Sequence, residues 1–125
     1  MAYYKTPAGK IIGMSQVTTH ILDLSAGTPA PGITVSLHRG EQDAWTEIAR
    51  GLTNADGRNS TLLENGTILQ PGIYKLRFET KDYFDSQSVS TFYPYVEIVF
   101  DVTAAAHYHV PLLLSPWGYS TYRGS

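Results

Sequence analysis

The sequence contains no cysteine. Disulfide bonds and thiolate catalysis are therefore excluded, and cysteine usage leaves the redox compartment open. An excess of charge of one sign is also lacking, because 9 basic and 11 acidic residues give a formal net charge of −2. This balance gives no reason to expect binding to nucleic acid or to an anionic membrane surface. No apolar run in the sequence approaches the ~18 residues of a membrane-spanning helix.

No targeting signal is expected either. Met1–Pro7 has no apolar core of the kind that a secretory signal requires, and the last three residues are not a Ser-Lys-Leu peroxisomal address. We expect a soluble, cytoplasmic protein, with peroxisomal and periplasmic locations left open. Residues 1–14 show little pattern and are expected to form a flexible N-terminal extension, followed by one domain over residues 15–125.

The chain does contain a series of short segments rich in β-forming residues. They are Val17–Leu24, Ile33–His38, Trp45–Leu52, Ile73–Glu79, Tyr95–Val102, Tyr108–Leu114 and Tyr119–Arg123, with at most a short edge strand within Asn59–Leu69. Only Thr80–Ser88 has helical character, with Thr80 as the expected N-cap. Regularly spaced short strands separated by Gly- and Pro-containing turns predict an antiparallel β-sandwich or barrel.

The C-terminal segment His107–Ser125 is the most apolar part of the chain and reads as two strands joined at Ser115–Gly118. Side chains alternate between the two faces of a strand, so two faces are expected. One carries Tyr108, Val110, Leu112 and Leu114, and the other carries His107, His109, Pro111 and Leu113. A terminus so aromatic and β-prone is expected to dock onto the fold.

Three polar side chains are candidates for chemistry, although each has an ordinary structural explanation. His20 lies mid-strand, where a half-buried histidine bonded to a neighbouring strand is common, and His109 lies in the most apolar strand, where it could be a core group. Arg58 follows an Asp-Gly turn and could be a solvated loop residue. The His107-x-His109 pair with His20 also allows a metal hypothesis. No carboxylate or cysteine stands beside these histidines in the sequence, and we expect no metal.

Four motifs resemble the transthyretin-like 5-hydroxyisourate hydrolases. They are Thr19-His20-Ile21-Leu22-Asp23, Thr53-x-x-Asp56-Gly57-Arg58, His107–Pro116 and Tyr122-Arg123-Gly124-Ser125. The terminal tetrapeptide alone would be weak, but four motifs in the family's order make the resemblance specific over roughly residues 15–125. It implies a transthyretin-like hydrolase domain, a sandwich of two four-stranded antiparallel sheets with one short helix. It also implies a homotetramer, a dimer of dimers with edge strands pairing between subunits.

The resemblance implies an activity and a site. The family hydrolyses 5-hydroxyisourate to 2-oxo-4-hydroxy-4-carboxy-5-ureidoimidazoline in urate and purine breakdown, at a site in the channel of the dimer–dimer interface. Carried over residue by residue, the catalytic residues are His20, Arg58, His109 and Ser125, and the substrate-binding residues are Arg58, Tyr122, Gly124 and Ser125. The resemblance implies no cofactor.

The chemistry of ring opening agrees with these residue types. A histidine can act as base or acid near neutral pH, and the planar, charged fork of Arg58 suits a urate-like anion and a developing oxyanion. The sequence has no Gly-x-Ser-x-Gly motif and no cysteine, so we expect direct attack by water. His20 is expected to be the general base or to orient the water, with His109 as partner in the proton transfers and His107 in a supporting role.

The tail has an unusual spacing. Tyr122 and Ser125 are three residues apart and would face opposite ways in a regular strand. A positive φ at Gly124 is expected to curl the chain, so that both hydroxyls, or the Ser125 carboxylate, reach the site. Arg123 is expected to anchor the tail by pairing with a carboxylate of its own or of a neighbouring subunit. The apolar residues expected at oligomer contacts are Pro111, Leu113, Trp117 and Tyr119.

The alternative within the same fold is a carrier of small ligands such as thyroid hormone, using the same channel. The resemblance implies that transthyretin, the carrier, lacks both histidines and the terminal Tyr-Arg-Gly-Ser that this chain has. A carrier has no need of two titratable imidazoles that face a guanidinium. A purely structural sandwich would leave the tetrapeptide unexplained.

Overall fold

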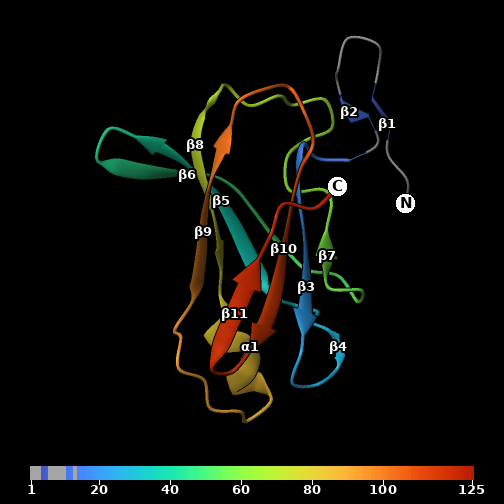
Figure 1. Cartoon of the computed structure of the whole chain (residues 1–125), viewed down its shortest axis with the longest axis vertical. Coiled ribbons are helices and arrows are strands. Elements are labelled where there is room, and N and C mark those ends of the chain that lie inside the picture. Colours follow the sequence, from blue (N-terminus) through green and yellow to red (C-terminus); the bar gives the residue numbers. More distant parts are fainter. Residues whose placement is uncertain (1–3, 6–10, 13) are drawn as a thin grey trace.

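The computed structural model describes residues 4–5, 11–12 and 14–125. These residues form one helix and a series of strands (Figure 1). The elements are β1 (Tyr4–Lys5), β2 (Ile11–Ile12), β3 (Val17–Asp23), β4 (Thr28–Pro29), β5 (Thr34–Glu41), β6 (Ala44–Leu52), β7 (Arg58–Asn59), β8 (Gly72–Phe78), α1 (Thr80–Ser86), β9 (Val96–Val102), β10 (Tyr108–Ser115) and β11 (Gly118–Thr121). The predicted all-β class with one short helix is confirmed.

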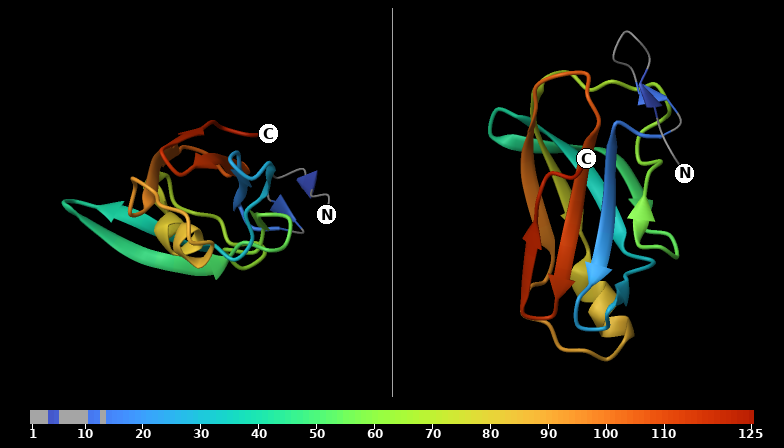
Figure 2. Two further views of the ribbon diagram at one scale, coloured as in Figure 1. Left: turned by 90° about the horizontal axis from the view of Figure 1, so that it is seen from below. Right: turned by 45° about the vertical axis from the view of Figure 1, so that its right-hand side comes forward.

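Two sheets face each other across the core, as the end-on view in Figure 2 shows. One sheet has the strand order β6-β5-β8-β9, and the other has the order β11-β10-β3-β4, with β7 also paired to β3. The first sheet is antiparallel throughout. The predicted sandwich is therefore confirmed.

The prediction of two purely antiparallel sheets is wrong at one pair. β10 runs parallel to β3, with Tyr108 opposite Val17 and Leu114 opposite Asp23. Alternation of apolar residues fixes which face of a strand is buried, but it does not fix the direction of a partner from the other end of the chain.

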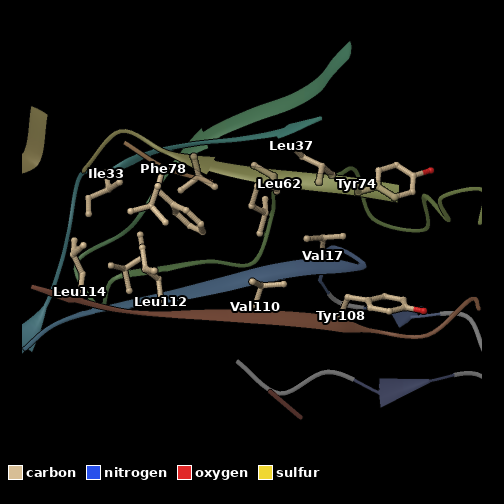
Figure 3. Packing of buried hydrophobic residues seen from close by; sticks show 14 of the residues in the cluster. Val17, Ile33, Leu37, Leu62, Tyr74, Phe78, Tyr108, Val110, Leu112 and Leu114 are labelled. Atoms are coloured by element: carbon tan, nitrogen blue, oxygen red, sulfur yellow. The ribbon is translucent and has the colours of Figure 1, made fainter. Parts of the chain in front are cut away.

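The core lies between the sheets, and the apolar face of β10 points into it (Figure 3). All four residues of that predicted face are buried, namely Tyr108, Val110, Leu112 and Leu114. The opposite sheet contributes fully buried side chains that include Leu37, Tyr74 and Phe78. Burial of one large apolar side chain stabilises a fold by about 1.5–3 kcal/mol, so the orientation of β10 is firmly set. Its other face, which carries His109, is consequently turned away from the core.

The helix α1 covers one end of the sandwich (Figure 1). Its N-cap position is Glu79, without a side-chain capping bond, so the prediction of Thr80 as cap is wrong. Thr80 is instead the first helical residue and is buried. The helix is fastened by packing of Tyr83 and Phe84 and by a 2.7 Å hydrogen bond that Tyr83 Oη donates to Asp23 Oδ2 at the end of β3. Tertiary contacts replace the missing cap.

The N-terminal segment contributes one antiparallel pair, in which Tyr4 lies opposite Ile12 and Lys5 opposite Ile11. Residues 1–3, 6–10 and 13 lie outside the described residues, so the flexibility expected for residues 1–14 and the domain boundary stay predictions. No helix in the described part of the chain has the length and apolar character needed to cross a membrane.

Candidate active site

Strand pairing brings the distant motifs together. β3 lies between β10 and β7, with Thr18 opposite His109 on one side and His20 opposite Arg58 on the other. The tail returns to the same place, because Gly124 forms an isolated antiparallel bridge with His109. The C-terminus therefore lies beside β3 and β10 (Figures 1 and 2). The parallel β3–β10 pair aligns the histidine-bearing parts of both strands.

A cavity of about 500 Å³ opens over these strands. It is lined by Met14, Thr18, Thr19, Asn54, Asp56, Arg58, Ser60, His107, His109 and Ser125. Three of the predicted site residues, Arg58, His109 and Ser125, thus meet at one cavity. His20 is not among the lining residues, but its half-buried imidazole is close enough for its charge to affect His109.

Arg58 is presented by a rigid turn. Asn54 Oδ1 accepts hydrogen bonds from the backbone N–H groups of Asp56 at 2.9 Å and Arg58 at 3.0 Å. Gly57 has a φ of 73°, and a Cβ on it would lie 2.4 Å from the Ile21 carbonyl oxygen. Only glycine fits this turn without strain. None of the ion pairs among the described residues involves Arg58, so its guanidinium is available to an anionic ligand in the cavity.

Both site imidazoles are held neutral. Burial, followed by the charges of His107, Arg58 and His20, lowers the pKa of His109 to about 4. Burial and then the charge of Arg58 also lower the pKa of His20, against a hydrogen bond to the backbone of Asp56 that raises it. A histidine must be neutral to accept a proton, and at neutral pH both meet this condition. The site therefore holds one permanent cation with two neutral bases.

Gly124 packs directly against the ring of His109. Its N–H donates a 2.9 Å hydrogen bond to the His109 carbonyl, and a Cβ at this position would lie 2.5 Å from His109 Cδ2. Gly124 is not among the glycines with positive φ, so the prediction of a positive φ at this position is wrong. The chain needs glycine here because the backbone approaches the imidazole closely, rather than because of a left-handed conformation.

Tyr122 and Ser125 lie at different cavities. Ser125 lines the main cavity, as predicted, whereas Tyr122 lines a second cavity of about 300 Å³. His109 lines both and forms the wall between them. Within one chain Tyr122 is not among the residues that line the main cavity.

Arg123 anchors the tail within its own chain without a carboxylate, and pairing with a carboxylate of a neighbouring subunit stays a prediction. Its guanidinium lies 4.5 Å from the centre of the Tyr108 ring, and Nη2 donates a 3.3 Å hydrogen bond to the carbonyl of His107. None of the ion pairs within the described residues involves Arg123, so a carboxylate of its own chain is not the partner. A cation–π contact and a carbonyl hold the tail instead.

Sequence reasoning missed Thr18. Its hydroxyl lies 2.7 Å from His109 Nδ1 and 2.8 Å from His107 Nε2, and the two rings stack with centroids 6.1 Å apart. The available signal was the spacing of Thr18 and His20, because residues two apart share a face of a strand. Among the described residues, no group of three or more His, Asp or Glu side chains is arranged to hold a metal ion.

Residues 17–124 match the family model described as HIUase/Transthyretin family. The chain is 48% identical over 114 residues to the 5-hydroxyisourate hydrolase of Mus musculus, covering 89% of this chain and 96% of that protein. The solved structure of Klebsiella pneumoniae 5-hydroxyisourate hydrolase superposes with a TM-score of 0.78 at 40% identity, over 87% of this chain and 98% of that one. Sea bream transthyretin in complex with thyroxine gives a TM-score of 0.78 at 33% identity, over 88% and 95%. The chain belongs to the HIUase/transthyretin family.

Proposed function

We infer that this protein is a hydrolase that opens 5-hydroxyisourate in urate degradation. One observation carries this conclusion: His109, Arg58 and Ser125 share a cavity and His20 lies beside it, in a chain 48% identical to a mouse 5-hydroxyisourate hydrolase. The substrate is an anionic, urate-like ring, and the available guanidinium of Arg58 suits it. A neutral imidazole near a fixed cation is the arrangement that hydrolysis of a ring carbonyl requires.

We propose that water attacks the ring carbonyl directly. His109 takes the proton of the water as a C–O bond forms, Arg58 stabilises the oxyanion, and the ring C–N bond then breaks as the departing nitrogen receives a proton. We assign the base role to His109, because it lines the cavity, and the role of orienting the water or the substrate to His20. Ser125 and the backbone of Gly124 complete the substrate-binding wall.

We propose further that the chain forms a homotetramer, a dimer of dimers whose sites lie at the interface between dimers. β9 and β11 are edge strands of their sheets, and an unpaired edge invites pairing with a second copy. Large apolar side chains are exposed close to β11. Trp117 and Tyr122, which flank this strand, are 67% and 58% exposed, and Phe92, which stacks on Trp117, is 66% exposed. Assembly would cover them and could bring Tyr122 to the site of a neighbouring subunit. A cytoplasmic location stays a prediction.

The hydrolase inference is tested by generating 5-hydroxyisourate with urate oxidase and following its decay spectrophotometrically. The wild type should accelerate the decay, whereas His109→Asn should lose about 100-fold or more, the usual contribution of a positioned base. His38→Asn is the matched control. His38 lies on β5 in the other sheet, where its ring bonds to Ser36, so this variant should retain activity. If the wild type leaves the spontaneous rate unchanged, the carrier alternative takes over, and thyroxine binding is measured next.

A further inference from the structure

A single buried hydroxyl connects His109 of β10 with His107, which lies just before that strand. Thr18 Oγ1 lies 2.8 Å from His107 Nε2 and 2.7 Å from His109 Nδ1. Thr18 is only 4% exposed and His107 only 8%, so water does not replace these bonds easily. The β-branched side chain of threonine has few rotamers, which fixes the direction of the hydroxyl. Because Thr18 lies opposite His109 in the parallel register, the bridge is built into the strand pairing.

The chemistry of the bridge couples the two rings. A hydroxyl has one proton to donate, and a neutral imidazole has one N–H and one bare nitrogen. When the Thr18 proton points to one ring, that ring must present a bare nitrogen, and the other ring satisfies the hydroxyl oxygen best by donating an N–H. The tautomer of His109 is therefore linked to the tautomer of His107 through Thr18.

The cavity favours one of the two arrangements. Nδ1 of His109 faces Thr18, so Nε2 is the nitrogen through which this ring can act on a ligand. Arg58 lines the same cavity and can only donate hydrogen bonds, so a bare Nε2 suits its surroundings better than an N–H does. His109 Nδ1–H then donates to Thr18, and the Thr18 hydroxyl donates to His107 Nε2.

We propose that Thr18 is a positioning residue that holds His109 in the tautomer of a base and passes the proton accepted at His109 Nε2 across its hydroxyl to His107. This inference deepens the proposed hydrolase and rests on it. It gives His107, expected from the sequence to play only a supporting role, the task of storing the proton during the attack of water.

The proton transfers balance. Water loses a proton to His109 Nε2 as its oxygen bonds to the ring carbonyl carbon. His109 Nδ1 releases its proton to Thr18 Oγ1, and Thr18 releases its original proton to His107 Nε2. Three bonds to hydrogen form and three break, and the positive charge ends on His107. The reverse transfer returns the proton through His109 Nε2 to the departing ring nitrogen.

The surroundings of His109 explain why such a route helps. The charged and titratable groups that act on His109 are His107, just before β10, together with Arg58 of β7 and His20 of β3. Burial and these charges lower the pKa of His109 to about 4, so this ring holds an added proton poorly. A relay relieves His109 of a positive charge that its position disfavours.

The test combines turnover with the tautomer of His109, read from ¹⁵N NMR of ring-labelled protein. In wild type at neutral pH, His109 should carry its proton on Nδ1, with Nε2 bare. Thr18→Val keeps the side-chain shape but removes the hydroxyl, and it should lower kcat by at least about 10-fold with little change in KM and release the tautomer preference. Thr18→Ser restores the hydroxyl and should recover most of the turnover and the Nδ1–H signal.

Two further variants keep the proposal open to refutation. His107→Gln should shift the His109 tautomer through Thr18, whereas Thr19→Val removes a hydroxyl that bonds to the Val110 carbonyl and should leave that tautomer unchanged. The proposal is overturned if wild-type His109 carries its proton on Nε2, if Thr18→Ser loses as much turnover as Thr18→Val, or if His107→Gln leaves the tautomer as it was. The NMR measurement needs no substrate, so failure of the relay is distinguishable from failure of the hydrolase inference.

Discussion

Gly124 and His109 touch so closely that no side chain fits between them, since a Cβ on Gly124 would lie 2.5 Å from His109 Cδ2 and 3.3 Å from Pro111 Cγ. The tail and the imidazole therefore set each other's positions. The Gly124 N–H also donates a 2.9 Å hydrogen bond to the His109 carbonyl, which holds the tail against β10 through the backbone. Ser125 reaches the main cavity because of this contact.

Gly124→Ala is consequently expected to displace either the tail or the His109 ring. Misplacement of a catalytic group by about 1 Å can cost about 100-fold in rate, so kcat/KM should fall by a factor of that order. Gly118→Ala is the control in the same hairpin, because a Cβ there would meet only Ser115 Oγ at 3.8 Å. Steady-state kinetics on both variants test this, and equal activities of the two would contradict the contact's importance.

Removal of Arg123–Ser125 should damage turnover far more than folding. The deletion removes Ser125 from the cavity wall and the Arg123 contacts with the Tyr108 ring and the His107 carbonyl, but it leaves the core face of β10 untouched. We expect kcat/KM to fall by at least about 100-fold, with a decrease in unfolding free energy of about 1–2 kcal/mol at most. Activity assays and thermal melts of the truncated chain measure both, and a fully active truncated protein would refute the docked tail.

The sequence alone predicted the features of the fold and site that depend on the local pattern of apolar and polar residues or on short motifs. Alternation placed Tyr108, Val110, Leu112 and Leu114 on the core face, and the motif match pointed to Arg58 and His109, which the fold brings to one cavity. Local alternation carries this information because residues two apart share a strand face regardless of the partner strand.

What the sequence did not reveal depends on pairing between distant segments. The parallel direction of β3 and β10 is a property of two strands about 90 residues apart, and alternation within either strand cannot encode it. The role of Thr18 follows from that pairing, because its hydroxyl meets two imidazoles only when β3 lies beside β10 in this register. The close approach of Gly124 to His109 is missed for the same reason.

Trp117 provides a test of the proposed assembly. Its ring is 67% exposed and stacks on Phe92 at 6.1 Å between centroids, next to the edge strand β11. Trp117→Glu places a charge in an apolar contact and should shift a tetramer toward dimers or monomers at micromolar concentration. Sedimentation velocity measures the change. The control is Leu24→Glu, a 58% exposed residue at the end of β3, which should leave the assembly intact.

Tyr83→Phe should lower stability without affecting turnover directly. The Tyr83 hydroxyl donates a 2.7 Å hydrogen bond to Asp23 Oδ2, and Asp23 is only 1% exposed, so the variant leaves part of a buried carboxylate without its partner. Hydrogen bonds to charged groups contribute about 1.5–3 kcal/mol to unfolding free energy. Urea denaturation measures the loss, and Tyr95→Phe, at a 38% exposed ring, serves as control with an expected change within about 0.5 kcal/mol. Equal stabilities of the two variants would contradict the role of this bond.

The pH dependence of the protein should follow its lowered imidazole pKa values. Since burial and neighbouring charges lower the pKa of His109 to about 4, the neutral base persists well below pH 6.5, and kcat/KM should stay level from about pH 6 to 8 and fall toward pH 4. The free energy of unfolding should also decrease toward low pH. Between about pH 6.5 and 4 the unfolded chain binds more protons at this residue than the folded one, so unfolding free energy decreases as the pH falls. Thermal melts of wild type and His109→Asn across this range test it, because the variant should lose part of the decrease. An activity that already halves at pH 6.5 would show that His109 is not the neutral base of the reaction.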